Sequence, residues 1–127
     1  MIDHISLGVR NLERSARFYE PTLATLGLSP LVTRPAAIGF GKGYPEFWIN
    51  LRADMARVAP GCGTHICLRA RTIAEVDAFH AAALTVGGTT DGAPGLRPHD
   101  RVKYYAAFVL DPDGNRIEAV TFVKGVK

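Results

Sequence analysis

The chain has 127 residues, with 15 lysines and arginines against 12 aspartates and glutamates, for a formal net charge of +3 at pH 7. This length suits one domain with a substantial core and excludes two independent domains. The basic residues are scattered, which argues against nucleic acid as a partner and slightly favours small anionic ligands. No apolar run has membrane-spanning length, and strand pattern begins at the N-terminus, so we expect no signal peptide, no membrane partner and a cytoplasmic location.

The first half of the sequence predicts a strand, a helix and three further strands. Residues 3–9 alternate between polar and apolar side chains, which is typical of a half-buried strand. A helix follows, with Asn11 as its N-cap and Gly27 at its end. Pro21 lies inside this helix and predicts a kink or a break near residues 17–20. Further strands are predicted over residues 30–34, 36–40 and 46–52.

The second half repeats this order of elements. Residues 63–70 alternate as a strand, and Thr72 with Glu75 forms a T-x-x-E capping box at the start of a helix. Residues 89–99 predict a loop or a broken strand, and strands follow over 104–111 and 116–123. The turn Asp111-Pro112-Asp113-Gly114 joins the last two, since proline fixes one dihedral angle and glycine supplies a positive one.

The two halves align without gaps at an offset of 61 residues (65 minus 4), which pairs His4 with His65. Seven identities fall in the 25 aligned positions from residue 4 to residue 28. This indicates two copies of one structural unit, a first module of about residues 1–53 and a second of about 62–124, that share a core. The predicted fold class is therefore α+β.

Two histidines and one carboxylate are expected on the inner faces of the sheets. His4 and His65 occupy equivalent places in the two copies, and Glu118 has the matching parity in the last strand. Two imidazoles and a carboxylate form a facial set that binds a divalent metal and leaves positions open for ligands. Fe(II), Mn(II), Ni(II), Zn(II) and Co(II) all suit this set, and the residues do not rank them.

Other polar residues on these faces are candidates for substrate contact. Cys62 and Cys67 lie five residues apart and predict free thiols, with Cys67 a small filler on the face of His65. A basic loop over residues 95–103, predicted as an insertion, would either cover an anionic ligand or be a plain solvated loop. The candidates for substrate contact are Trp48, Asn50, Arg52, Cys67, Arg69, His99, Arg101, Lys103 and Tyr105.

The sequence resembles the vicinal oxygen chelate superfamily, which includes glyoxalase I, extradiol dioxygenases and bleomycin resistance proteins. The resemblance covers essentially residues 2–123, and four stretches carry it: Asp3-His4-Ile5, residues 18–28, Gly63-Thr64-His65-Ile66 and residues 111–118. It implies paired βαβββ modules that curl into an open, cup-shaped barrel. It also implies that His4, His65 and Glu118 bind the metal.

The resemblance further implies a fourth ligand, a glutamate in the fourth strand. An offset of 68 residues (118 minus 50) places Asn50 at that position. An amide does not take a proton at neutral pH, so we expect no true lactoylglutathione lyase activity. The reaction is left open among lyase, transferase and extradiol-type dioxygenase chemistry, with His99 or Tyr105 as a conceivable acid or base in the last.

An alternative function is a metal-free protein that sequesters a small molecule in the same cup, as bleomycin resistance proteins do. The retention of three ligand-type residues favours the enzyme. In either case the resemblance and the small size of the chain predict a homodimer, in which the two copies stand side by side or exchange modules.

Overall fold

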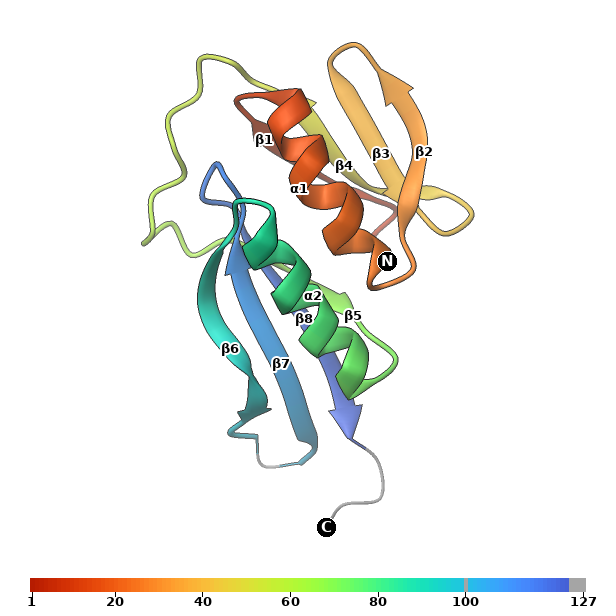
Figure 1. Cartoon of the computed structure of the whole chain (residues 1–127), viewed down its shortest axis with the longest axis vertical. Helices are drawn as coiled ribbons and strands as arrows, with labels where there is room; N and C mark the ends of the chain where they lie inside the picture. Colours follow the sequence, from red (N-terminus) through yellow and green to blue (C-terminus); the bar gives the residue numbers. More distant parts are fainter. Residues whose placement is uncertain (100, 124–127) are drawn as a thin grey trace.

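A computed structural model describes residues 1–99 and 101–123 of the protein. The first module contains β1 (Ile5–Val9), α1 (Leu12–Ala24), β2 (Ser29–Arg34), β3 (Ala37–Gly41) and β4 (Pro45–Leu51). The second contains β5 (His65–Arg69), α2 (Ile73–Thr85), β6 (Thr89–Arg97), β7 (Lys103–Leu110) and β8 (Arg116–Val123). Two βαβββ modules in an α+β fold are thus confirmed (Figure 1). Asp100 of the predicted basic loop and residue 124 of the predicted second module lie outside the described residues.

Both modules build a four-stranded sheet with the same order, β1-β4-β3-β2 and β5-β8-β7-β6. The pairs β1–β4 and β5–β8 are parallel, and the other pairs are antiparallel. One helix covers one face of each sheet, and α1 packs against α2 at the boundary between the modules (Figure 1). Within the described residues, no helix is long and apolar enough to cross a membrane.

Helix α1 runs through Pro21 without interruption, so the break predicted near residues 17–20 is wrong. Proline at this position removes the helical donor of the Arg17 carbonyl. Arg17 and Pro21 are both exposed. Because they lie on the solvent face, the Arg17 carbonyl is open to water, which can stand in for the missing donor.

The ends of the helices follow the predicted capping. The side chain of Asn11 accepts a hydrogen bond from a backbone N–H at 2.9 Å, and Thr72 accepts one from the backbone of Glu75 at 3.1 Å. The carboxylate of Glu75 accepts from the backbone N–H of Arg71 at 2.9 Å, one residue before the partner that a capping box predicts. Gly27 has a φ of 82° after α1, a left-handed conformation that favours glycine.

The pairing of the central strands corrects the predicted equivalence between the modules. Ser6 lies opposite Trp48 in β1 and β4, and Cys67 lies opposite Glu118 in β5 and β8. Ser6 and Cys67 are equivalent at the offset of 61, which also relates the starts of α1 and α2. The counterpart of Glu118 is therefore Trp48, at an offset of 70 (118 minus 48), and not Asn50.

The offset between equivalent residues of the two modules rises from 61 to 70, and this rise occurs in the β6–β7 hairpin. Two residues, 35 and 36, connect β2 to β3, whereas residues 98–102 connect β6 to β7. Residues 89–97, predicted as a loop or a broken strand, form β6 with register shifts between Thr90 and Gly92 and between Gly92 and Gly95. Such irregularities interrupt the alternation on which strand prediction depends. The predicted insertion is mainly a longer hairpin.

The faces of the two sheets that meet the helices share one core. Phe18 and Tyr19 of α1 and Phe79 of α2 are fully buried in it. From the strands, Phe47 and Ile117 extend this core into both sheets. The predicted division between a helix-facing apolar side and a polar inner side is thus observed in both modules.

The turn between β7 and β8 joins the second module to the first. The fully buried carboxylate of Asp113 accepts hydrogen bonds from Nε of Arg10 at 2.7 Å and Nη2 of Arg14 at 2.9 Å. Nδ2 of Asn115 donates to the carbonyl oxygen of Gly8 at 3.1 Å. We call Asp113, Asn115, Arg10 and Arg14 the inter-module clamp. It fixes the start of α1 against the end of β7.

Candidate functional site

His65 and Glu118 meet on the face of the second sheet that points away from the helices. Nε2 of His65 lies 3.0 Å from Oε1 of Glu118. The other carboxylate oxygen, Oε2, accepts a hydrogen bond from the hydroxyl of Tyr104. Glu118 is only 2% exposed. Both of its oxygens thus have protein donors, which stabilises the buried carboxylate.

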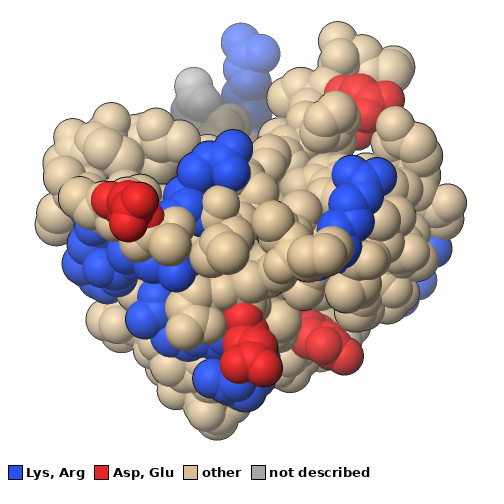
Figure 2. All heavy atoms as spheres, turned by 90° about the horizontal axis from the view of Figure 1, so that it is seen from above, with Lys and Arg blue, Asp and Glu red and all other residues tan. Residues whose placement is uncertain are grey.

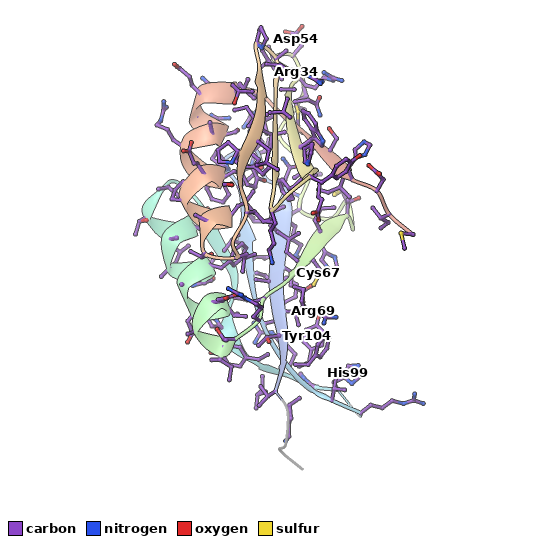
Figure 3. All side chains as sticks on the ribbon, turned by 90° about the vertical axis from the view of Figure 1, so that its right-hand side faces the viewer. Arg34, Asp54, Cys67, Arg69, His99 and Tyr104 are labelled. Carbon is purple, nitrogen blue, oxygen red and sulfur yellow. The ribbon has the colours of Figure 1, made fainter. Side chains whose placement is uncertain are left out.

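Tyr104 is a site residue that the sequence analysis missed, because it named Tyr105 instead. The hydroxyl of Tyr105 donates to Asp77 of α2 at 2.6 Å, so this side chain faces the helix and lies away from the site. The alternation of apolar residues in this strand distinguishes the two tyrosines, since Ala107 and Val109 share the parity of Tyr105 and are buried in the core. Figure 3 shows Tyr104 with Cys67 and Arg69 on the side of the sheet opposite α1 and α2.

Cys67 lies at the edge of this group. Its Sγ is 3.9 Å from the hydroxyl oxygen of Tyr104. Burial, together with the negative charge of Glu118, raises the pKa of the Cys67 thiol to about 11. The thiol is therefore protonated at neutral pH and is a poor nucleophile. Cys67 as a whole is exposed, so the structure does not confirm the predicted role of a small buried filler.

His4 lies just before β1 and is oriented by a carboxylate. Its Nδ1 is 2.6 Å from Oδ1 of Asp3, and the hydroxyl of Tyr44 donates to the same oxygen at 2.9 Å. These hydrogen bonds, that of His4 first, lower the pKa of the Asp3 carboxyl. A carboxylate on one ring nitrogen fixes the tautomer and leaves the other nitrogen, Nε2, for a ligand.

A cavity of about 320 Å³ between the modules brings His4 and His65 to one space, which Glu46 and Cys67 also line. Within residues 1–99 and 101–123, no three His, Cys, Asp or Glu side chains stand close enough to hold a metal ion together. The His65–Glu118 pair still fits a metal, because two neighbouring donors about 2.1 Å from one ion are about 3.0 Å apart. The outward Nε2 of His4 is a suitable third donor.

A second cavity, of about 310 Å³, lies on the inner face of the first module. Nδ2 of Asn50 donates to Oγ of Ser6 at 2.6 Å and to the carbonyl oxygen of Leu7 at 3.0 Å, which fixes the orientation of this amide. The guanidinium carbon of Arg34 lies 5.1 Å from the ring centroid of Trp48. The cavity is lined by His4, Ser6, Arg34, Ala37, Tyr44, Pro45, Trp48 and Asn50. Sequence reasoning missed Arg34 and Tyr44, which share no motif with the other residues.

The remaining predicted contacts divide into two groups. The His99 ring stacks on that of Tyr104 with centroids 6.0 Å apart, and the guanidinium of Arg69 lies 4.6 Å from the ring centroid of Phe122. These two border the His65–Glu118 pair. Arg52, Arg101 and Lys103 line neither cavity. Arg101 donates its backbone N–H to Nδ1 of His99 at 3.2 Å, and Arg52 donates to the carbonyl of Leu51 at 2.9 Å.

Charge is mixed on the surface that Figure 2 shows. Basic and acidic side chains are interspersed there, with broad uncharged areas between them. An extended single-sign surface of the kind that binds nucleic acid is absent from this view.

Two βαβββ modules with polar residues on their inner faces define a glyoxalase-like, cup-forming protein. The family model described as Glyoxalase/Bleomycin resistance protein/Dioxygenase superfamily matches residues 1–119, and the chain belongs to this superfamily. A comparison with curated proteins gives no match.

Solved structures agree with this assignment. A glyoxalase/bleomycin resistance protein from Albidiferax ferrireducens is 36% identical, with a TM-score of 0.84 over 94% of this chain and 98% of that one. A glyoxalase-related enzyme from Fulvimarina pelagi is 24% identical, with a TM-score of 0.71 over 94% and 86% of the two chains. A mutant of glyoxalase I from Zea mays is 22% identical, with a TM-score of 0.71 over 92% of this chain and 44% of that one. The last two show the fold alone.

Proposed function

We propose that the protein is a metal-dependent enzyme in which His4, His65 and Glu118 hold one divalent ion. The observation that carries this proposal is the His65–Glu118 pair, whose nitrogen and oxygen stand 3.0 Å apart on the inner face. The bound metal would supply Lewis acidity to an oxygen-bearing, anionic small molecule. The three side chains are oxygen and imidazole donors that suit Fe, Mn, Ni, Zn or Co.

The neighbouring residues would prepare these ligands. Asp3 orients the ring of His4 so that Nε2 points outward, and Tyr104 holds one oxygen of Glu118. Such supporting hydrogen bonds commonly tune a metal site. Lyase, transferase and extradiol-type dioxygenase reactions all remain compatible with this set. A true lactoylglutathione lyase is disfavoured, since Trp48 at the counterpart of Glu118 is neither a ligand nor a base.

A second candidate is a metal-free protein that sequesters a small molecule. The specific observation in its favour is that both oxygens of Glu118 already accept hydrogen bonds from His65 and Tyr104. A buried carboxylate satisfied in this way needs no cation. The two candidates therefore differ in whether a metal displaces these hydrogen bonds.

Metal titration separates the two candidates. The enzyme proposal expects at least one of Fe(II), Mn(II), Ni(II), Zn(II) and Co(II) to raise the Tm by several degrees, because a ligand of the native state stabilises it by mass action. Glu118→Gln and His65→Ala should each abolish the shift. His80→Gln is the matched control, since His80 pairs with Thr90 at 2.7 Å, outside both cavities. Equal shifts in all variants, or no shift with any metal, would reject the metal site.

A further inference from the structure

We propose that the cavity of the first module is an anion subsite that binds the carboxylate of a small planar ligand through Arg34, which Trp48 holds in place. This inference does not depend on the metal site. It rests on the residues that line the cavity, above all Arg34, which the sequence did not identify as a candidate contact.

The strand register gives the first line of argument. In the second module the position opposite Cys67 carries the acidic Glu118, and the equivalent position of the first module carries Trp48. The first cavity has no aspartate or glutamate in its lining and contains the guanidinium of Arg34. The residue opposite the strand partner is thus a carboxylate in the second module and a neutral indole in the first. In the first cavity Arg34 is therefore the charged lining group, with the carboxylate of Asp3 bound to His4 and Tyr44 at its border.

The N–H donors of the Arg34 guanidinium have no hydrogen-bond partner among the described residues. Within the described part of the chain the guanidinium carbon of Arg34 lies over the Trp48 ring, 5.1 Å from its centroid, and the guanidinium forms no ion pair or hydrogen bond there. A cation–π contact does not occupy the N–H groups of a guanidinium, which stay available to a ligand. These groups match a carboxylate with two parallel hydrogen bonds.

The indole beneath Arg34 is held by the neighbouring strand. A Cβ atom added to Gly39 would lie 2.8 Å from atoms of the Trp48 ring, so only glycine allows the ring to pack this closely on β3. A ring fixed in this way orients Arg34 before a ligand arrives, which reduces the entropy lost on binding.

The size of the cavity indicates the ligand. A volume of about 310 Å³ is at the lower end for small-molecule sites, which suits one ring or a short conjugated chain. Planarity matters because the ligand would lie beside a stacked pair of flat groups, Trp48 and Arg34. Figure 3 shows Arg34 at the far end of the molecule from Tyr104 and His99, so this subsite is separate from the His65–Glu118 pair.

Trp48 is the one tryptophan of the sequence, so its fluorescence reports on this cavity directly. The full-length protein, treated with EDTA, is titrated with benzoate at constant ionic strength and checked by calorimetry. Benzamide has the same shape without the charge, and cyclohexanecarboxylate has the charge without the plane. We expect a saturable change with benzoate and binding at least about tenfold weaker for each of the other two ligands.

Variants assign the binding to Arg34. Arg34→Gln should weaken benzoate binding by about tenfold or more, and Arg34→Lys should fall between it and the native protein. Arg17→Gln, on the exposed face of α1, is the matched control and should bind as the native protein does. The proposal is overturned if benzoate gives neither a fluorescence change nor heat, if benzamide binds equally, or if Arg34→Gln and Arg17→Gln behave alike. Because His4 lines this cavity and is also a proposed metal ligand, the titration uses the EDTA-treated protein, so a failed metal site would not affect the result.

Discussion

Glu118 combines deep burial with complete hydrogen bonding, and each of its donors should contribute to stability. Its two oxygens face His65 and Tyr104, and the side chain is 2% exposed. A carboxylate in such a place is costly when one donor is lost, because a buried acceptor is then left with fewer hydrogen bonds.

Tyr104→Phe should therefore lower the free energy of unfolding by about 1–3 kcal/mol, measured by urea denaturation. Tyr105→Phe is the matched control. It removes a hydrogen bond of similar length to Asp77, but Asp77 is exposed and water can replace the donor. Equal losses in the two variants would mean that Tyr104 does not support Glu118.

Cys67 should show its raised pKa in its reactivity. Since the thiolate forms only as the pH approaches about 11, roughly one thiol in a thousand is ionised at pH 8. Alkylation by iodoacetamide, followed by mass spectrometry of the peptide, should be slow at pH 8 and rise about tenfold per pH unit up to pH 10. Glu118→Gln removes a nearby negative charge and should speed the reaction at pH 8. A rate independent of pH would contradict the assigned environment.

Substitutions at Trp48 and Asn50 test which of these two positions is the counterpart of Glu118. The strand register assigns the counterpart of Glu118 to Trp48, so Trp48→Glu should add a carboxylate near His4, whereas Asn50→Glu should add one two residues further along. We expect the larger increase in metal affinity from Trp48→Glu, measured by competition with a chelator, and no lactoylglutathione formation by the native protein. A larger gain from Asn50→Glu would restore the equivalence predicted from the sequence.

At the scale of elements, alternation and capping were sufficient to predict both modules. They identified both helices and the strands other than β6, which was predicted as a loop or a broken strand, and they placed His65 and Glu118 on one face, because a strand has only two faces. They did not predict the register, since that depends on which residues lie opposite one another across β1 and β4. Residues two apart in a strand lie on the same face. The alternation therefore did not distinguish Asn50 from Trp48 as the counterpart of Glu118.

The other errors have equally local causes. Pro21 was expected to break α1, but the sequence does not reveal that the affected carbonyl faces solvent. Tyr105 was named as a candidate, whereas Tyr104 is the tyrosine that bonds Glu118, although the strand pattern distinguishes the two. Arg34 and Tyr44 come from different elements of the first module and reach the same cavity only through folding.

The inter-module clamp joins two elements that are about a hundred residues apart. Asp113→Asn keeps the shape of the side chain and removes its charge from Arg10 and Arg14. We expect a loss of about 2 kcal/mol in the free energy of unfolding, less than for a wholly buried pair because both arginines are partly exposed. Asp91→Asn, which breaks a partly exposed pair with Arg116 at 2.5 Å, is the control and should cost less than about 1 kcal/mol. Equal costs would show that the clamp is no stronger than a surface ion pair.

At the scale of the whole molecule, we expect a homodimer, and its metal sites lie either within one chain or between the two copies. His4 and His65 line one cavity, yet His4 stands apart from the His65–Glu118 pair, so the third donor can come from the same chain or from a second copy. A mixture of His4→Ala and His65→Ala chains distinguishes these cases after unfolding and refolding together. Shared sites should return about a quarter of the native metal content, since half of the dimers are mixed and each holds one intact site. No recovery, or a sedimentation mass equal to one chain, would contradict sharing.

The inter-module clamp should also hold the two modules together when the connector between them is cut. The same turn holds the connector between the modules, because the backbone N–H of Val58 donates to the carbonyl of Asp113 at 2.9 Å and Arg57 donates to that of Pro112 at 2.9 Å. Beyond these contacts, residues 59–64 are exposed. A protease that cuts there should leave two fragments that stay together as one folded particle. The protein is thus a natural candidate for division into two separately expressed halves that reassemble without a covalent link.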